Sequence, residues 1–163
     1  MKKILIGLLL VVVPIRWGGV NLMPAFLGYV LIFLGLGQGW KSESLAASRT
    51  IAVASAALTA ALWVAALLGY GMAFPLERFL QLLMGYRLLI WCEEQTEWEW
   101  GWRIGRLRLS WYAWAGAAAA SILLGVFDGV LRLVWAGAAL AAGLYYIYTF
   151  YRLSRLVPRE EQP

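Results

Sequence analysis

Long stretches without a single charged residue dominate the polarity pattern of this chain. Four of them stand out, at 17–40, 50–76, 109–127 and 133–151. An α-helix rises about 1.5 Å per residue, so crossing the ~30 Å hydrocarbon core of a bilayer takes about 20 apolar residues. Because unpaired backbone groups are costly in lipid, a stretch of this length and polarity predicts a membrane-spanning helix.

Two further apolar segments are less regular. Residues 4–15 are apolar but short, and the segment 74–92 contains three charged side chains. Long charged side chains near a helix end reach the headgroups, which permits a spanning helix at 74–92. An interfacial helix is the alternative for that segment. For the N-terminal segment the alternative is a cleaved signal peptide, although no small-residue cleavage site follows it.

The first two apolar segments are predicted to form a helical hairpin. Gly18 and Gly19 interrupt the pattern, and Asn21 followed by Pro24 is typical of a helix start. The sequence therefore predicts an all-α fold, a polytopic membrane helix bundle with about six transmembrane helices that forms one domain over 1–163. The expected helices are 3–16, 23–39, 46–70, 74–92, 109–127 and 130–151, with a cytoplasmic loop at 93–108.

The basic residues predict the orientation. With the N-terminus inside, ten of the 14 lysines and arginines face the cytoplasm, three face the outside, and Arg87 lies within the membrane. The cytoplasmic ones are Lys2, Lys3, Lys41, Arg49, Arg103, Arg106, Arg108, Arg152, Arg155 and Arg159, and the outer ones are Arg16, Arg78 and Arg132. This is the bias of the positive-inside rule, so both termini are expected in the cytoplasm of a bacterial inner membrane.

Composition agrees with lipid as the main surroundings. Hydrophobic residues make up 63% of the 163 residues and charged ones 14%, whereas soluble domains average about 45–50% and about 25%. The net charge of +5 is then explained by basic residues at a membrane face, and no nucleic-acid partner is expected. The chain has no histidine and only one cysteine, Cys92, which excludes imidazole catalysis, disulfides and thiolate zinc sites. We expect no enzyme, no cofactor and no metal.

The stretch NLMPAFLGYVLIFLGL, at 21–36, resembles a segment of a family of small uncharacterised bacterial multi-pass membrane proteins. In that family a short N-terminal helix precedes a helix with an "LPDFIGYILI"-like sequence. The resemblance covers about the first 40 residues. Ala25 stands where the family has an acidic residue. The resemblance implies a topology and no particular activity.

The segment 91–108 combines carboxylates, tryptophans and arginines. Tryptophan prefers the headgroup zone and arginine meets anionic lipid, so an interfacial loop is one interpretation. A docking surface is the second, because Trp and Arg dominate binding hot spots. A carboxylate metal site at Glu93, Glu94 and Glu97 is a third and weaker interpretation. The candidate partner or lipid contacts are Trp98, Trp100, Trp102, Arg103, Arg106 and Arg108.

Polar residues within the fourth predicted helix are candidates for ligand binding. Such residues usually face a bundle interior or a watery cavity. The candidates are Glu77, Arg78, Gln81 and Arg87. An arginine that extends to the headgroups is the alternative for Arg87. Four tyrosines near the end of the last helix, at 145, 146, 148 and 151, are interpreted as an aromatic belt, with a ligand pocket as the alternative.

Small residues four apart mark helix contacts in lipid. The pairs Gly116/Ala120, Gly137/Ala141 and Ala139/Gly143 predict packing inside the bundle or, alternatively, association with a second copy. The partners expected are the bilayer, a protein at the cytoplasmic face, and a second copy of the chain. We interpret the protein as a non-catalytic accessory or regulatory membrane protein. The alternative is a small-solute binding or transport subunit similar in architecture to the substrate-binding components of vitamin transporters.

Overall fold

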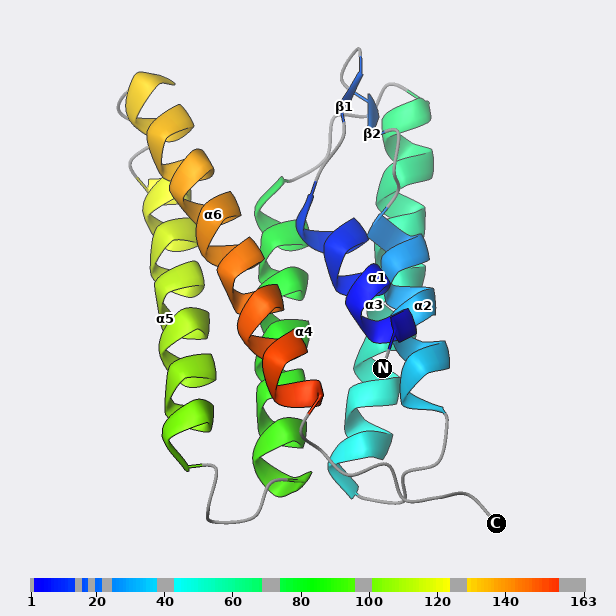
Figure 1. Ribbon diagram of the computed structural model, residues 1–163. Helices are drawn as coiled ribbons and strands as arrows, with labels where there is room; N and C mark the ends of the chain where they lie inside the picture. Colours follow the sequence, from blue (N-terminus) through cyan, green and yellow to red (C-terminus); the bar gives the residue numbers. More distant parts are fainter. Residues whose placement is uncertain are drawn as a thin grey trace. The chain divides into compact units, whose positions relative to one another are not determined.

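Helices account for almost all of the fold (Figure 1). The computed structural model describes residues 2–13, 16–17, 20–21, 25–37, 43–68, 74–95, 101–123 and 129–155. The elements are α1 (Lys2–Val12), β1 (Arg16–Trp17), β2 (Val20–Asn21), α2 (Ala25–Leu36), α3 (Glu43–Leu67), α4 (Phe74–Gln95), α5 (Gly101–Leu123) and α6 (Gly129–Ser154). The all-α class is confirmed, with one short antiparallel pair in which Trp17 faces Val20.

The first two helices are shorter than predicted. The helix expected over 3–16 ends at Val12, and the one expected over 23–39 covers Ala25–Leu36. Pro14 lacks a backbone N–H and disfavours helical angles at the residue before it, so α1 stops ahead of it. The last backbone bond at the end of α2 runs from the Gly37 N–H to the Phe33 carbonyl, 3.1 Å away.

The helices around the expected cytoplasmic loop are longer than predicted. The loop was expected over 93–108, but α4 continues to Gln95 and α5 begins at Gly101. Counting charge-free residues identifies the apolar turns of a helix. It misses the charged turns that continue the same helix beyond them. Arginine, leucine and tryptophan all tolerate helix well, so the backbone stays helical beyond the apolar stretch.

The chain divides into two compact units, Met1–Arg87 and Leu88–Pro163, where one domain was expected. In the first unit, α1 packs against α2 with almost no side chain between the backbones. A Cβ added to Gly7 would lie 2.5 Å from the Gly28 carbonyl oxygen, and one added to Gly28 would lie 2.6 Å from the Gly7 oxygen. Further along the same pair of helices, a Cβ added to Gly35 would lie 2.5 Å from a side-chain carbon of Ile4. This contact depends on residues without a side chain.

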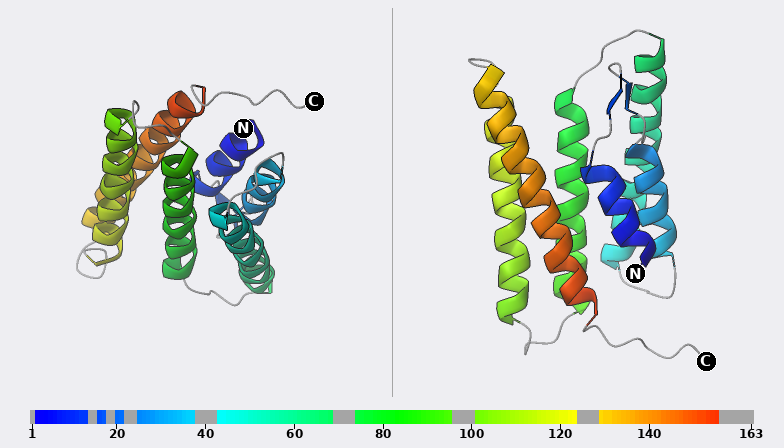
Figure 2. Two further views of the ribbon diagram at one scale, coloured as in Figure 1. Left: turned by 90° about the horizontal axis from the view of Figure 1, so that it is seen from below. Right: turned by 45° about the horizontal axis from the view of Figure 1, so that its top comes forward.

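In the second unit, α5 and α6 form an antiparallel pair, which both views of Figure 2 keep side by side. Their buried residues follow three- and four-residue steps, as in a coiled-coil seam. On α5 these are Leu107, Ser110, Trp114, Ala117, Ala118 and Ser121, and on α6 they are Ala139, Gly143, Tyr146, Phe150 and Leu153.

Aromatic rings fill the middle of this seam. The Trp114 ring lies 5.6 Å from that of Tyr146, which lies 6.4 Å from Phe150. Trp91, on the part of α4 that belongs to this unit, reaches Phe150 at 6.5 Å. All four side chains are at most 1% exposed.

The predicted pairs of small residues divide between two environments. Ala139 and Gly143 are buried, as expected for packing inside the fold. Gly116 and Gly137 are exposed instead, and a Cβ at either position would meet no atom within 4 Å. Those two glycines therefore take no part in helix contacts within the described part of the chain.

Two of the described helices are long and apolar enough to cross a membrane, Leu45–Leu67 in α3 and Gly129–Ser154, which is α6. Only 17% and 18% of the residues in their most apolar windows are buried within the protein. Large apolar side chains consequently lie on the outside, among them Leu133, Val134 and Leu109, which are 74%, 60% and 68% exposed.

Candidate functional site

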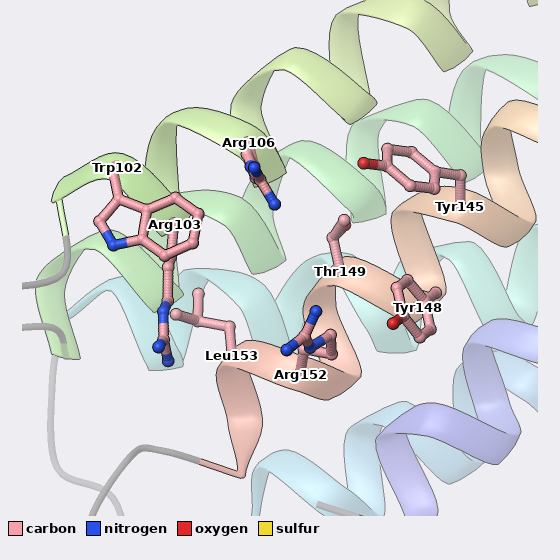
Figure 3. A pocket seen from close by; sticks show the side chains of 8 residues that line it. All are labelled: Trp102, Arg103, Arg106, Tyr145, Tyr148, Thr149, Arg152 and Leu153. Atoms are coloured by element: carbon pink, nitrogen blue, oxygen red, sulfur yellow. The ribbon is translucent and has the colours of Figure 1, made fainter.

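A hollow of about 60 Å³ opens between the first turns of α5 and the last turns of α6 (Figure 3). Its walls consist of three arginines, three aromatic side chains, one threonine and one leucine. The lining residues are Trp102, Arg103, Arg106, Tyr145, Tyr148, Thr149, Arg152 and Leu153. None of the eight carries a carboxylate, so the hollow is strongly positive.

Packing of the helix pair places this site. Because α5 and α6 are antiparallel, the start of one meets the end of the other, and Leu107 and Leu153 are buried at that level. The Ser110 hydroxyl lies 3.1 Å from that of Thr149 and joins the helices just below the hollow. Thr149 also donates to the Tyr146 carbonyl at 2.8 Å. The Thr149 hydroxyl thus has hydrogen-bond partners on both helices, and the Thr149 side chain forms part of the wall of the hollow.

Aromatic rings hold two of the arginines. The Arg106 guanidinium carbon lies 4.6 Å from the centre of the Trp102 ring, and that of Arg152 lies 5.9 Å from the Tyr148 ring. Stacking of this kind uses the face of the guanidinium and leaves its N–H edges available for an anion. In Figure 3, Arg106 approaches from α5 and Arg152 from α6, while the hydroxyl ends of Tyr145 and Tyr148 turn toward the arginines.

Of the two other arginines at the start of α5, Arg103 also contacts an aromatic ring and Arg108 does not line the hollow. The Arg103 guanidinium also lies against the Trp102 ring, at 5.3 Å. Arg108 points elsewhere and forms an ion pair with Glu93 near the end of α4, with an N–O distance of 2.7 Å. Both partners are partly exposed, so the pair adds at most about 1 kcal/mol. Its main effect is to join the end of α4 to the start of α5.

The structure therefore brings three of the six interface candidates into one site, namely Trp102, Arg103 and Arg106. Arg108 lies outside the hollow, and Trp98 and Trp100 lie outside the described residues, as does Glu97 of the carboxylate metal hypothesis. Among the described residues no three carboxylate or thiol groups gather as they would around a metal ion. The donors that line the hollow suit an anion.

The ligand candidates on α4 are used differently. Gln81 donates to the Val11 carbonyl of α1 at 2.8 Å and accepts from Arg78 at 3.3 Å. Arg78 and Gln81 are 7% and 3% exposed. The last carbonyls of a helix have no partner within it, and the Gln81 amide N–H satisfies one of them. Gln81 therefore caps α1, and Arg78 bonds to the same Gln81 side chain.

The other two candidates on α4 are partly buried. Glu77 directly precedes Arg78 in the sequence, and its side chain is not free of interactions. Arg87 has a buried Nε atom with no hydrogen-bond partner among the described residues. Neither of them lines the hollow at the end of α5 and α6.

Replacing Gln81 by leucine is expected to lower the free energy of unfolding by about 1–3 kcal/mol, because the buried Val11 carbonyl and Arg78 each lose a partner. The second variant, Gln81→Glu, keeps an acceptor for Arg78 but loses the N–H donor, so it tests the α1 cap alone. Thermal unfolding of both variants in mild detergent measures the effect. Two melting temperatures equal to that of the wild type would show that this hydrogen-bond chain adds no stability.

Sequence reasoning missed the α6 half of the site. Arg152 was counted only as a cytoplasmic charge, and Tyr145 and Tyr148 were assigned to an aromatic belt. The available signal was the short connection between the last two helices, which makes them antiparallel and brings the beginning of one beside the end of the other. The chain matches no family model, no curated protein and no solved structure.

Proposed function

We propose that the protein is a multi-pass protein of the bacterial inner membrane and acts without catalysis, by binding a protein partner at its cytoplasmic face. The observation that carries the membrane placement is the outward exposure of the two helices that are long and apolar enough to span a bilayer, since less than a fifth of their most apolar windows is buried within the protein. A core helix of a soluble protein would be mostly covered. Apolar surface on this scale needs lipid or a partner to cover it.

Helix length supports four full spans. At 1.5 Å per residue, α3, α4, α5 and α6 are about 33–39 Å long, which exceeds the ~30 Å hydrocarbon core. The helices α1 and α2 reach only about 16–18 Å each. We propose that these two form a hairpin that enters the membrane beside α3 and returns to the same side. Because such a hairpin begins and ends on the same side of the membrane, the later spans keep the orientation that the basic residues predict.

Two contacts support that orientation. Gln81, in the first half of α4, bonds to the last turn of α1, which is the end of the hairpin that lies within the membrane. Glu93 near the end of α4 pairs with Arg108 at the start of α5, and both are predicted on the cytoplasmic side. Both contacts thus join parts of helices that the proposed topology places at the same level.

The site supports partner binding better than solute transport. A transporter needs polar groups that converge at depth, yet Gln81 caps α1 and Arg78 bonds to Gln81. Trp102, by contrast, is 58% exposed at a polar helix end, with two arginines against its ring. Exposed tryptophan beside arginine is the composition of binding hot spots. The surface of Trp102 and its arginines is therefore the proposed partner contact.

A photo-crosslinking amino acid at position 102 tests this proposal in cells. We expect one discrete protein adduct at position 102 and none at position 112, whose tyrosine is equally exposed (58%) but lies within the apolar part of α5. The protein is also expected to resist extraction of the membranes with alkaline carbonate. Release by carbonate would reject the membrane placement. The same adduct at both positions, or none at 102, would reject the partner contact.

A further inference from the structure

We infer that the hollow between α5 and α6 binds the phosphate group of an anionic phospholipid, whose acyl chain runs along the exposed face of α6. This inference rests on the proposed membrane placement. The shared chemistry is a phosphate oxyanion, which a lipid headgroup or a free phosphate could supply. The structure favours the lipid, for the reasons that follow.

Charge and donor geometry point to an oxyanion. Arg103, Arg106 and Arg152 converge from two helices on a hollow without a carboxylate. Among the described residues, neither Arg106 nor Arg152 lies within ion-pair distance of an acidic side chain. Guanidinium edges match the oxygens of a phosphate in pairs, and such charge-assisted bonds are about twice as strong as neutral ones.

Size limits what enters the hollow. Its volume of about 60 Å³ is several times the ~10–15 Å³ that a water molecule needs. A hollow of this size admits one phosphate group. The rest of the ligand must leave through the open side, where Tyr145 and Tyr148, each 52% exposed, form the rim.

A smooth apolar track continues from that rim along α6. In steps of three or four residues from Arg152 toward the start of the helix come Tyr148, Tyr145, Ala141 and Gly137, all of them exposed. A Cβ at Gly137 would meet no atom within 4 Å, so nothing in the described part of the chain fills this stretch. These small, exposed residues leave the outer face of α6 open to an acyl chain, with Tyr145 and Tyr148 at the end nearest the hollow. A free phosphate ion makes no contact with that face, so we assign the site to the lipid.

The lipid and the proposed partner contact share Arg106, because this arginine lines the hollow and also lies against Trp102. The phosphate takes the space between Arg106 and Arg152, while the exposed part of Trp102 stays available to a protein. The phosphate also neutralises arginines that otherwise repel one another, so bound lipid is expected to order the start of α5.

Native mass spectrometry of the full-length protein in uncharged detergent tests the site, with phosphatidylglycerol as probe and phosphatidylcholine as the zwitterionic comparison. We expect retained phosphatidylglycerol, and at least a tenfold loss of affinity in the double variant Arg106→Gln/Arg152→Gln, since each arginine supplies charged hydrogen bonds. The matched control is Arg108→Gln/Arg155→Gln, which removes the same charge outside the hollow, once from α5 and once from the residue that follows α6. We expect the control to change affinity less than about twofold.

Two further measurements distinguish the sources of phosphate. Ala141→Leu fills the track without touching the arginines and is expected to weaken phosphatidylglycerol binding, while millimolar inorganic phosphate is expected not to displace the lipid. Displacement by inorganic phosphate together with an unaffected Ala141→Leu variant would overturn the lipid assignment. Equal losses in the two double variants would overturn the site itself. Circular dichroism and the rescue variant Arg106→Lys/Arg152→Lys, which keeps the charge but not the paired edges, exclude misfolding as the cause.

These outcomes are separable from failure of the proposed function. Lack of lipid binding by a protein that still resists carbonate extraction rejects only the lipid site. Release of the protein from washed membranes rejects the membrane placement on which the site depends.

Discussion

Replacing Gly7 by alanine is expected to lower the free energy of unfolding by about 1–3 kcal/mol, the usual cost of overpacking a close contact. The new methyl group would lie 2.5 Å from the Gly28 carbonyl oxygen and 2.8 Å from an Ile32 side-chain carbon. Backbone atoms cannot turn aside as the end of a flexible side chain can. The two helices must therefore separate, and they lose the contacts on both sides of the glycines.

Gly116→Ala and Gly137→Ala are matched controls. They make the same substitution within a helix, but at positions where a Cβ meets nothing within 4 Å. Alanine is the better helix former by about 0.5–1 kcal/mol, so these variants are expected to be neutral or slightly more stable. The sign of the change thus distinguishes a steric effect from a propensity effect.

Equilibrium unfolding in mixed detergent micelles, followed by tryptophan fluorescence and circular dichroism, measures all three variants. An unchanged midpoint for Gly7→Ala would mean that α1 and α2 are further apart than the structure places them. A loss at Gly116 or Gly137 as large as at Gly7 would mean instead that those glycines take part in a contact between copies of the chain.

The sequence predicted six helices from four charge-free runs and two less regular apolar segments, and the described part of the chain contains six helices. It was less accurate at their ends, for reasons that differ from helix to helix. Pro14 shortens α1, whereas the start of α5 at Gly101 lies in a charged segment that polarity counting treats as loop. The close approach of Gly7 and Gly28 depends on how two helices cross, which neither sequence position reveals alone.

The candidate site shows the same limit. Trp102, Arg103 and Arg106 stand out in the sequence because tryptophan and arginine alternate there. Arg152 does not stand out, since an arginine after an apolar helix is what any membrane protein shows. Only the antiparallel packing of α5 and α6 turns four separate residues into one hollow. On α4, polarity at depth suggested a ligand for Gln81, and the contact with the end of α1 explains it more simply.

Replacing Trp114 by alanine is expected to give the largest loss of stability, about 3–5 kcal/mol, because it opens a cavity in the middle of the α5–α6 seam. The side chain is 1% exposed and packs on Tyr146, which in turn packs on Phe150. Removing it leaves the buried Tyr146 ring without its neighbour on α5. Unfolding of the purified protein in detergent, followed by circular dichroism, measures the change.

Tyr112→Ala provides the comparison, since Tyr112 lies two residues away on the outer face of the same helix and is 58% exposed. A large surface residue of this kind is expected to change stability by less than about 0.5 kcal/mol. Trp114→Phe should fall between the two. It keeps an aromatic ring and removes an indole N–H that has no hydrogen-bond partner among the described residues. Equal losses for Trp114→Ala and Tyr112→Ala would contradict the buried seam, because the two faces of α5 would then be equally covered.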